Sequence, residues 1–254
     1  MDHFQSALDV VLDRLGRIRD DGGRWPRASR SALTLLRQTP ATPATPAASG
    51  SKTERLAEVR SRVAICRLCP HLAETRTQTV FGTGSEDAEI MFIGEAPGAD
   101  EDRRGEPFVG AAGQLLTKII ETMGFAREDV FIANVLKSRP DMPPGTPGNR
   151  PPTPQEMQNC LPFLIEQIKI VQPRVLVALG ATAVEGLLGT RGTMRELRGK
   201  WHAFEGTPLM ITYHPSYLLR NQSLTEKRKV WEDMLLVLEK IGRPITEKQR
   251  RYFL

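Results

Sequence analysis

After residue 50, short apolar runs alternate with segments of helical periodicity. Four runs are almost continuously apolar, which is typical of strands buried on both faces. They are residues 88–94 (AEIMFIG), 129–135 (DVFIANV), 174–180 (RVLVALG) and 208–214 (PLMITYH). Apolar residues at helical spacing predict helices over residues 52–65, 111–123, 153–171 and 224–241, and one after residue 180 through Leu188. Strands separated by helices predict an α/β fold with a parallel sheet covered on both faces.

The first 51 residues follow a different pattern. Residues 1–38 predict an accessory amphipathic helix region, with apolar residues at Phe4, Leu8, Val11, Leu12, Leu15 and Ile18. Residues 39–51 contain a Pro/Ala/Thr repeat typical of an extended linker. The accessory helix either packs on the rest of the chain or docks on a partner. Residues 52–254 are expected to form one domain.

Composition narrows the function classes. No apolar run approaches the roughly 20 residues of a membrane span, and Asp2, Asp9 and Asp13 interrupt the apolar residues of the N-terminus. A secretory signal is therefore not expected, and we expect a cytoplasmic protein with no membrane partner. The net charge of +5 favours a polyanionic partner.

Three cysteines, Cys66, Cys69 and Cys160, make up the thiol content of the chain. An odd number without an export signal argues against a disulfide framework. The Cys66-x-x-Cys69 spacing leaves a redox dithiol or half of a metal site open.

Polar residues follow three of the predicted strands at their carboxyl ends. Glu95 follows the first strand, Asn134 ends the second and His214 ends the fourth. Ligands of parallel α/β sheets bind at this edge. Each residue also has a structural interpretation: a tight turn at Gly94 for the first, a loop cap for Asn134 and a hydrogen-bonded histidine for His214.

Together the three groups suit hydrolysis of an N-glycosidic bond. A histidine stabilises the anionic leaving base, a carboxylate stabilises the oxocarbenium-like sugar, and an amide reads a pyrimidine edge. Phe108 could supply the surface on which a flipped base stacks.

Five motifs give the chain a family resemblance. They are GEAPGADED (94–102), GEPFVG (105–110), NVLKSRP (134–140), GNRPPTP (148–154) and HPSYLLR (214–220). From about Cys66 to Ile241 the chain resembles the family-4, iron–sulfur uracil-DNA glycosylases. This resemblance implies a central four-stranded parallel sheet between helices, and a monomeric enzyme that removes uracil from single- or double-stranded DNA and leaves an abasic site.

The resemblance also implies roles for individual residues. Glu95 positions water or stabilises the sugar cation, and the backbone around Gly94 contacts the base. Phe108 stacks on uracil, Asn134 reads its edge and His214 contacts O2. Tyr217 and Leu218 enter the minor groove, and Arg220 meets phosphate. In the run Asp100–Asp102, one residue helps with water or the run is a solvated loop face.

One position departs from the family pattern. Family members hold a [4Fe–4S] cluster with four cysteines, and Cys66, Cys69 and Cys160 match three of them. Ser138 occupies the remaining position, where an alkoxide is a harder and less common ligand than a thiolate. Ser138 ligates through oxygen, or three protein ligands leave one iron open, or the cluster is labile or absent. We expect a less stable cluster with a structural role.

Two alternative functions are compatible with the sequence. One is a uracil-DNA binder without turnover, which in a related subgroup crosslinks to the abasic sugar. That subgroup carries a basic, His-containing insertion after its first motif, and residues 103–110 leave no room for it. The other is a redox-responsive DNA-binding protein that uses Cys66, Cys69 and Cys160.

Overall fold

The structure is a computed structural model that describes residues 50–142, 146 and 148–254. Residues 1–49 lie outside the described residues, so the accessory helix and nearly all of the linker stay predictions. The first described helix begins at Lys52, after Ser51 accepts a hydrogen bond from the Glu54 N–H. No helix in the described part of the chain combines the length and apolar character needed to cross a membrane.

The described residues form one mixed sheet with the strand order β1-β3-β2-β4-β6-β5. Its four inner strands are parallel: β3 (Phe131–Asn134), β2 (Ile90–Gly94), β4 (Val175–Leu179) and β6 (Thr207–Thr212). Each coincides with one of the four predicted runs to within two residues at its ends, which confirms the predicted parallel core. Every residue of β2, β3 and β4 is buried, as continuous apolar runs require.

Two antiparallel edge strands, β1 (Thr83–Gly84) and β5 (Trp201–Phe204), were not predicted. β1 has only two residues, and β5 is mostly half-buried or exposed, so neither presents a long apolar run. β5 joins β6 through Glu205 and Gly206, whose φ angles are 48° and 77°. Positive φ at both central residues is the geometry of a type I′ hairpin turn.

The helices agree with the periodic segments and add several short elements. Their bounds are α3 (Lys52–Ala64), α4 (Pro70–Thr75), α5 (Ala99–Arg104), α6 (Ala111–Met123), η1 (Arg127–Asp129), α7 (Pro154–Val171), α8 (Ala181–Leu188), α9 (Met194–Leu197), α10 (Pro215–Arg220), α11 (Leu224–Lys240) and α12 (Glu247–Arg250). At the start of α7, Thr153 and Glu156 form a capping box, with Pro154 at the first helical position.

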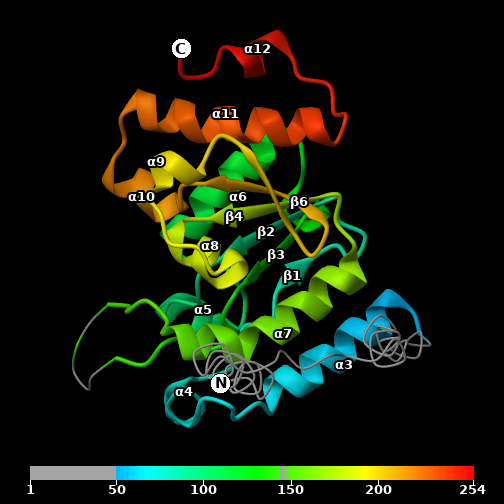
Figure 1. Cartoon of the computed structure of the whole chain (residues 1–254), viewed down its shortest axis with the longest axis vertical. Helices are drawn as coiled ribbons and strands as arrows, with labels where there is room; N and C mark the ends of the chain where they lie inside the picture. Colours follow the sequence, from blue (N-terminus) through cyan, green and yellow to red (C-terminus); the bar gives the residue numbers. More distant parts are fainter. Residues whose placement is uncertain (1–49, 143–145, 147) are drawn as a thin grey trace, which may run out of the picture. The chain divides into compact units, whose positions relative to one another are not determined.

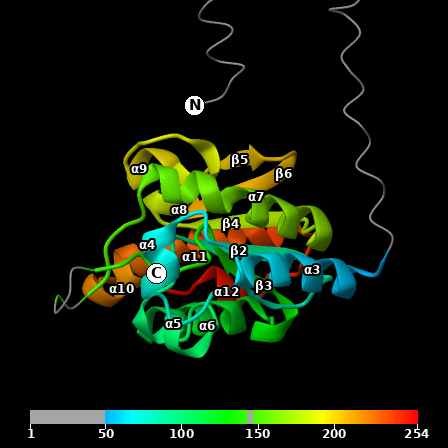
Figure 2. The same ribbon diagram turned by 90° about the horizontal axis from the view of Figure 1, so that it is seen from below.

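Helices cover both faces of the sheet, which gives three layers (Figures 1 and 2). On β2, Met91 and Ile93 pack into a core with residues of α3, α7 and α8. Ile90 and Phe92 point to the opposite face and pack with residues of α6 and α11. Successive residues of a strand face opposite sides, so one apolar run serves both cores. The carboxyl ends of the parallel strands are left free of these layers.

Candidate active site

The carboxyl ends of the central strands open into a cavity of about 560 Å³. Glu95 directly follows β2, Asn134 ends β3 and His214 lies two residues beyond β6. These three residues line the cavity together with Phe108 and Arg220. A cavity of this size lies in the usual range for small-ligand sites and has room for a pyrimidine base. The structure therefore brings the predicted base-contacting side chains to one place.

Gly94 lets an aromatic ring and an amide approach the same strand end. It pairs with Asn134 across the β2–β3 ladder. A Cβ at Gly94 would lie 2.4 Å from Asn134 Oδ1 and 2.5 Å from Phe108 Cζ. Such distances are far inside van der Waals contact, so any side chain here would displace both groups. The contact between the Gly94 region and a base stays a prediction.

Asn134 is buried, and a hydrogen bond to its backbone carbonyl holds it in place. Its carbonyl oxygen accepts a 2.9 Å hydrogen bond from the Lys137 Nζ, which also donates to Gln167 Oε1 at 2.6 Å. Within the described residues, no hydrogen bond engages the Asn134 side-chain amide, which faces the cavity. An amide offers one acceptor and one donor group, which matches a pyrimidine edge.

The loop that carries Phe108 is held in an unusual conformation. Phe108 has a φ of 54°, which is rare for a non-glycine residue and requires support from its surroundings. Glu101 Oε1 accepts hydrogen bonds of 2.9 Å from the N–H groups of Val109 and Gly110. Arg127 donates to the Phe108 carbonyl at 3.0 Å. The ring consequently lies 5.6 Å from the His214 ring, at an angle of 30°.

His214 presents a neutral ring with a defined tautomer. Burial, with the nearby positive charge of Arg220, lowers the pKa of His214 to about 4. The Ser216 backbone N–H donates to His214 Nδ1 at 3.1 Å, so Nδ1 is an acceptor. A neutral imidazole with an accepting Nδ1 carries its proton on Nε2. The ring therefore offers an N–H donor without a positive charge.

Glu95 lines the same cavity, and burial also changes the acidity of its carboxyl group. Burial raises the pKa of its carboxyl group, and a hydrogen bond from the Thr182 side chain partly opposes this effect. The group is an acid whose proton is held more tightly than usual. A carboxylate with few hydrogen-bond partners is suited to orient water or to face a developing cation.

Comparisons with known proteins agree with this geometry. The family model of the uracil DNA glycosylase superfamily matches residues 81–235. The chain belongs to this superfamily. It is 45% identical to a type-4 uracil-DNA glycosylase of Thermotoga maritima over 72% of this chain and 93% of the relative. It is also 41% identical to the Archaeoglobus fulgidus type-4 enzyme, over 68% and 88%, and 42% identical to the Pyrobaculum aerophilum type-4 enzyme, over 66% and 87%.

In this superfamily member, the two adjacent leucines after His214 lie in different environments. Leu218 is only 4% exposed and packs into the protein, whereas Leu219 is 40% exposed. Successive residues of a helix point about 100° apart, so α10 turns Leu218 inward and Leu219 outward. Leu219 is the more exposed of the two leucines, and the predicted entry of Leu218 into the minor groove stays a prediction. Arg220 is exposed at the cavity, where it can meet phosphate.

Tyr217, the other residue predicted to enter DNA, is held by local contacts. Its ring stacks on Tyr213 with 4.5 Å between the centroids. Its hydroxyl donates to Glu226 Oε2 at 3.3 Å and accepts from Asn221 Nδ2 at 3.2 Å. Entry into a minor groove would break these contacts, so Tyr217 is placed to support α10. Its proposed role in DNA binding stays a prediction.

The acidic run splits into three different environments. Asp100 is exposed and pairs with Arg103. Glu101 lines the cavity and holds the Phe108 loop. Asp102 is 4% exposed and accepts the Thr77 N–H at 3.0 Å. Neither predicted alternative describes all three, because helix α5 turns successive residues to different sides.

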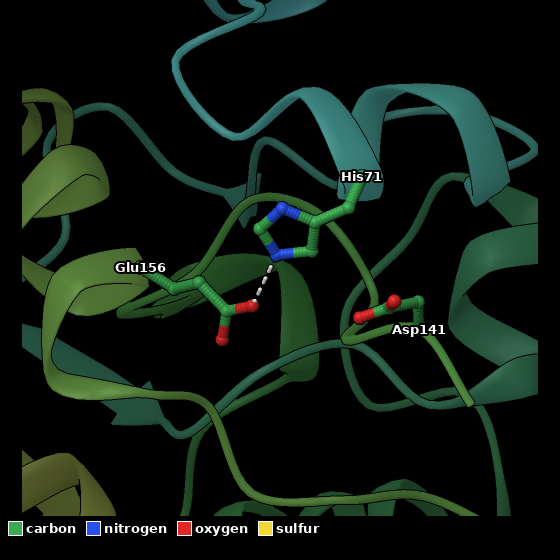
Figure 3. Close-up of side chains that lie close together, drawn as sticks. All are labelled: His71, Asp141 and Glu156. Carbon is green, nitrogen blue, oxygen red and sulfur yellow. Dashed lines mark hydrogen bonds and ion pairs between the residues drawn. The ribbon is translucent and has the colours of Figure 1, made fainter. Parts of the chain in front are cut away.

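Arg150 was quoted in a motif but given no role from sequence, and it lines the cavity. Its guanidinium donates to Glu156 Oε1 at 2.7 Å and also pairs with Asp141. Glu156 in turn contacts His71 Nε2 at 2.7 Å, as Figure 3 shows. Burial would raise the pKa of Glu156, but hydrogen bonds from Arg150, His71 and the Thr153 N–H hold it at about 2.

This network accounts for the acidic groups that could otherwise suggest a metal site. One ligand atom each of His71, Asp141 and Glu156 lies within 4.8 Å of the other two. The Arg150 guanidinium already bonds to both carboxylates and compensates their charge. The trio is therefore an ion-pair network that connects α4, the loop before α7 and the cavity wall.

The three cysteines converge from separate elements. Cys66 and Cys69 lie between α3 and α4 and are half-buried, and Cys160 lies buried on α7. Burial raises the pKa of the Cys160 thiol; the Lys137 backbone N–H opposes this, and negative charge on Cys69 and Cys66 adds to it. The thiols are therefore close enough to interact electrostatically. Asn159 Nδ2 lies 3.3 Å from Cys69 Sγ and donates toward it.

This donor set fits an iron–sulfur group at three corners. Thiolates are the usual ligands of such clusters, and N–H groups directed at sulfur stabilise the thiolate form. The remaining predicted corner, Ser138, is 5% exposed, and its Oγ accepts a 2.9 Å hydrogen bond from Arg76 Nη1.

Proposed function

We propose that this chain is a uracil-DNA glycosylase that hydrolyses the N-glycosidic bond of deoxyuridine flipped out of DNA and leaves an abasic site. The substrate is DNA, and the cavity holds the extruded base. The similarity to type-4 uracil-DNA glycosylases over most of their length supports this reaction. The active form that we propose is a monomer.

The cavity walls suggest how uracil is bound. The Phe108 ring stacks on the face of the base, and the Asn134 amide pairs with its edge. Gly94 supplies a backbone surface without a side chain, so the base can approach the strand end. The hydrogen bonds that the Asn134 amide offers favour uracil over bases whose edge has a different pattern of donors and acceptors.

The observation that carries the mechanism is the neutral, Nε2-protonated His214 in this cavity. Uracil departs as an anion with charge on O2. A fixed N–H donor aimed at that oxygen stabilises the charge as it forms, in the manner of an oxyanion hole. A neutral imidazole also holds a flipped base without attracting a competing anion beforehand.

Glu95 acts on the sugar side of the reaction. The glycosidic bond breaks through an oxocarbenium-like state, which a carboxylate stabilises. The same carboxylate accepts a hydrogen bond from the attacking water and directs it to the sugar carbon. Arg220 and the basic surface of the chain hold the phosphate backbone while the base is extruded.

A cleavage assay tests the proposal. Purified full-length chain is incubated with an oligonucleotide that contains one uracil and then treated with hot alkali. We expect strand breakage by wild type and by the control variant His202→Ala. His202 lies on edge strand β5, and its imidazole bonds to the Leu197 carbonyl. Asn134→Ala and His214→Ala should be strongly impaired.

Two results would contradict the proposal. Undiminished breakage by both cavity variants would remove the assigned roles of Asn134 and His214. A covalent protein–DNA band on a denaturing gel, without alkali-labile product, would instead support the binder that does not turn over.

We also propose that Cys66, Cys69 and Cys160 hold an iron–sulfur cluster with a structural role. The fit of the three thiols and the N–H donors around them supports this assignment. When bound, the cluster supplies a covalent tie between the segment at Cys66 and α7. No chemical step at the sugar or base passes through it.

A further inference from the structure

We infer that the cluster is held by three thiolates alone, with one iron corner left without a protein ligand beside Ser138. This inference rests on the proposed cluster. The observations behind it are the contacts of Ser138 and Arg76, which differ from those of the three cysteines.

Ser138 is engaged as a hydrogen-bond acceptor. Its Oγ is 2.9 Å from Arg76 Nη1, and a guanidinium can only donate. Within residues 50–142 and 148–254, no carboxylate or imidazole accepts a hydrogen bond from Ser138 Oγ. The Ser138 oxygen is therefore already engaged by a cation. Oxygen is also a poor match for the softer iron–sulfur corner.

Arg76 connects the segment at Cys66 to the segment at Ser138, as a fourth cluster ligand would otherwise do. Its Nη2 donates to the Cys66 carbonyl at 2.9 Å and to the Ala64 carbonyl at 3.3 Å. Its Nη1 holds Ser138, on the segment after β3. The guanidinium therefore ties the two segments together without iron. Charged donors make the stronger class of hydrogen bonds, so this tie persists when iron is absent.

The hydrogen-bond donor at the Cys69 sulfur differs from the donor at Ser138. Asn159 Nδ2 donates toward Cys69 Sγ at 3.3 Å, whereas the Ser138 oxygen accepts from the Arg76 guanidinium. Donors of this kind stabilise a metal-bound thiolate.

An open corner has a defined chemical consequence. A one-electron oxidant such as ferricyanide converts [4Fe–4S]²⁺ into [3Fe–4S]⁺, with release of one Fe²⁺ and transfer of one electron to ferricyanide. The charges balance, and the three thiolates retain the remaining cluster. A cluster with four cysteine ligands resists this loss because each iron is anchored.

The test compares full-length wild type, Ser138→Ala and Ser138→Cys after anaerobic reconstitution with iron and sulfide. Iron per chain is counted before and after ferricyanide, released Fe²⁺ is trapped with a chelator, and the paramagnetic signal of [3Fe–4S]⁺ is recorded. We expect wild type and Ser138→Ala to lose one iron of four and to give this signal. Ser138→Cys should retain all four.

Other outcomes overturn the inference. Retention of four irons by wild type, with loss from Ser138→Ala, would make the serine oxygen a ligand. Retention by all three proteins would mean that another group closes the corner, and loss from all three would place the open corner elsewhere. Failure of wild type to load iron would show that three thiolates are insufficient. Uracil excision is measured separately, so a metal-free but active wild type would remove this inference and leave the proposed function standing.

Discussion

The substitution Gly94→Ala probes the cavity with a single methyl group. The added Cβ would lie 2.4 Å from Asn134 Oδ1 and 2.5 Å from Phe108 Cζ. Ordinary contact begins at 3.4 Å, so both groups must move by about 1 Å. Gly94 is not in the left-handed region, so its backbone accepts alanine and the effect is steric.

The expected loss of activity is large and the expected loss of stability is smaller. A displacement of about 1 Å in a reacting geometry lowers the rate on the order of 100-fold, or about 2.7 kcal/mol in transition-state free energy. Phe108 and Asn134 border the open cavity, which leaves room for relaxation, so we expect a stability cost near the lower end of the roughly 1–3 kcal/mol seen for overpacking.

The assay is single-turnover excision from a uracil oligonucleotide, with thermal unfolding measured on the same samples. Gly192→Ala is the matched control, because its Cβ would meet only Leu197 side-chain atoms at 3.3–3.5 Å, outside the cavity. Wild-type excision by Gly94→Ala, with an unchanged melting temperature, would refute the assigned positions of the ring and the amide.

Three further predictions concern protonation and packing. Burial lowers the pKa of His214 to about 4 and raises the pKa of Glu95, so we expect the fall of kcat/KM at acid pH to reflect protonation of Glu95, with a midpoint above the usual carboxyl value. A pH profile with a midpoint near 6.5 that persists in Glu95→Gln would contradict this expectation. Leu218→Ala should lower the free energy of unfolding by about 2–5 kcal/mol, as urea unfolding can check. Leu219→Ala should leave the free energy of unfolding unchanged but slow uracil excision from duplex DNA more than from single-stranded DNA, as parallel kinetics can check. Arg150→Met leaves the Glu156 side chain, 3% exposed, without its guanidinium partner, so the free energy of unfolding should fall by about 3–5 kcal/mol. An unchanged stability in calorimetry would show that the Glu156 carboxylate does not depend on this cation.

The sequence predicts the parts of the fold that depend on continuous burial. Strands β2, β3, β4 and β6 are recognisable because both faces of each are covered by helices. The edge strands are not, because β5 is partly exposed and is defined by pairing through the Glu205–Gly206 turn. Their identity depends on hydrogen bonds to a neighbour that no local apolar pattern records.

The same distinction applies to the site. Glu95, Asn134 and His214 are predictable because a parallel sheet brings the residues at the carboxyl ends of its strands to one edge. Leu218 and Leu219 are adjacent leucines, and only the rotation of α10 against the core decides which is exposed. Arg150 reaches the cavity through ion pairs with Asp141 and Glu156, so its role becomes visible only when these carboxylates are placed.

Different hydrogen bonds hold Asn134 and the segment at Cys66 in place. The Lys137 ammonium joins the Asn134 carbonyl to Gln167 on α7, and Gln167 Nε2 donates to the Phe81 carbonyl at 2.9 Å. These buried bonds fix Asn134 without any metal. The segment at Cys66 instead depends on Arg76 and on the three thiols. Loss of the proposed cluster should therefore loosen the segment at Cys66 before it disturbs the cavity.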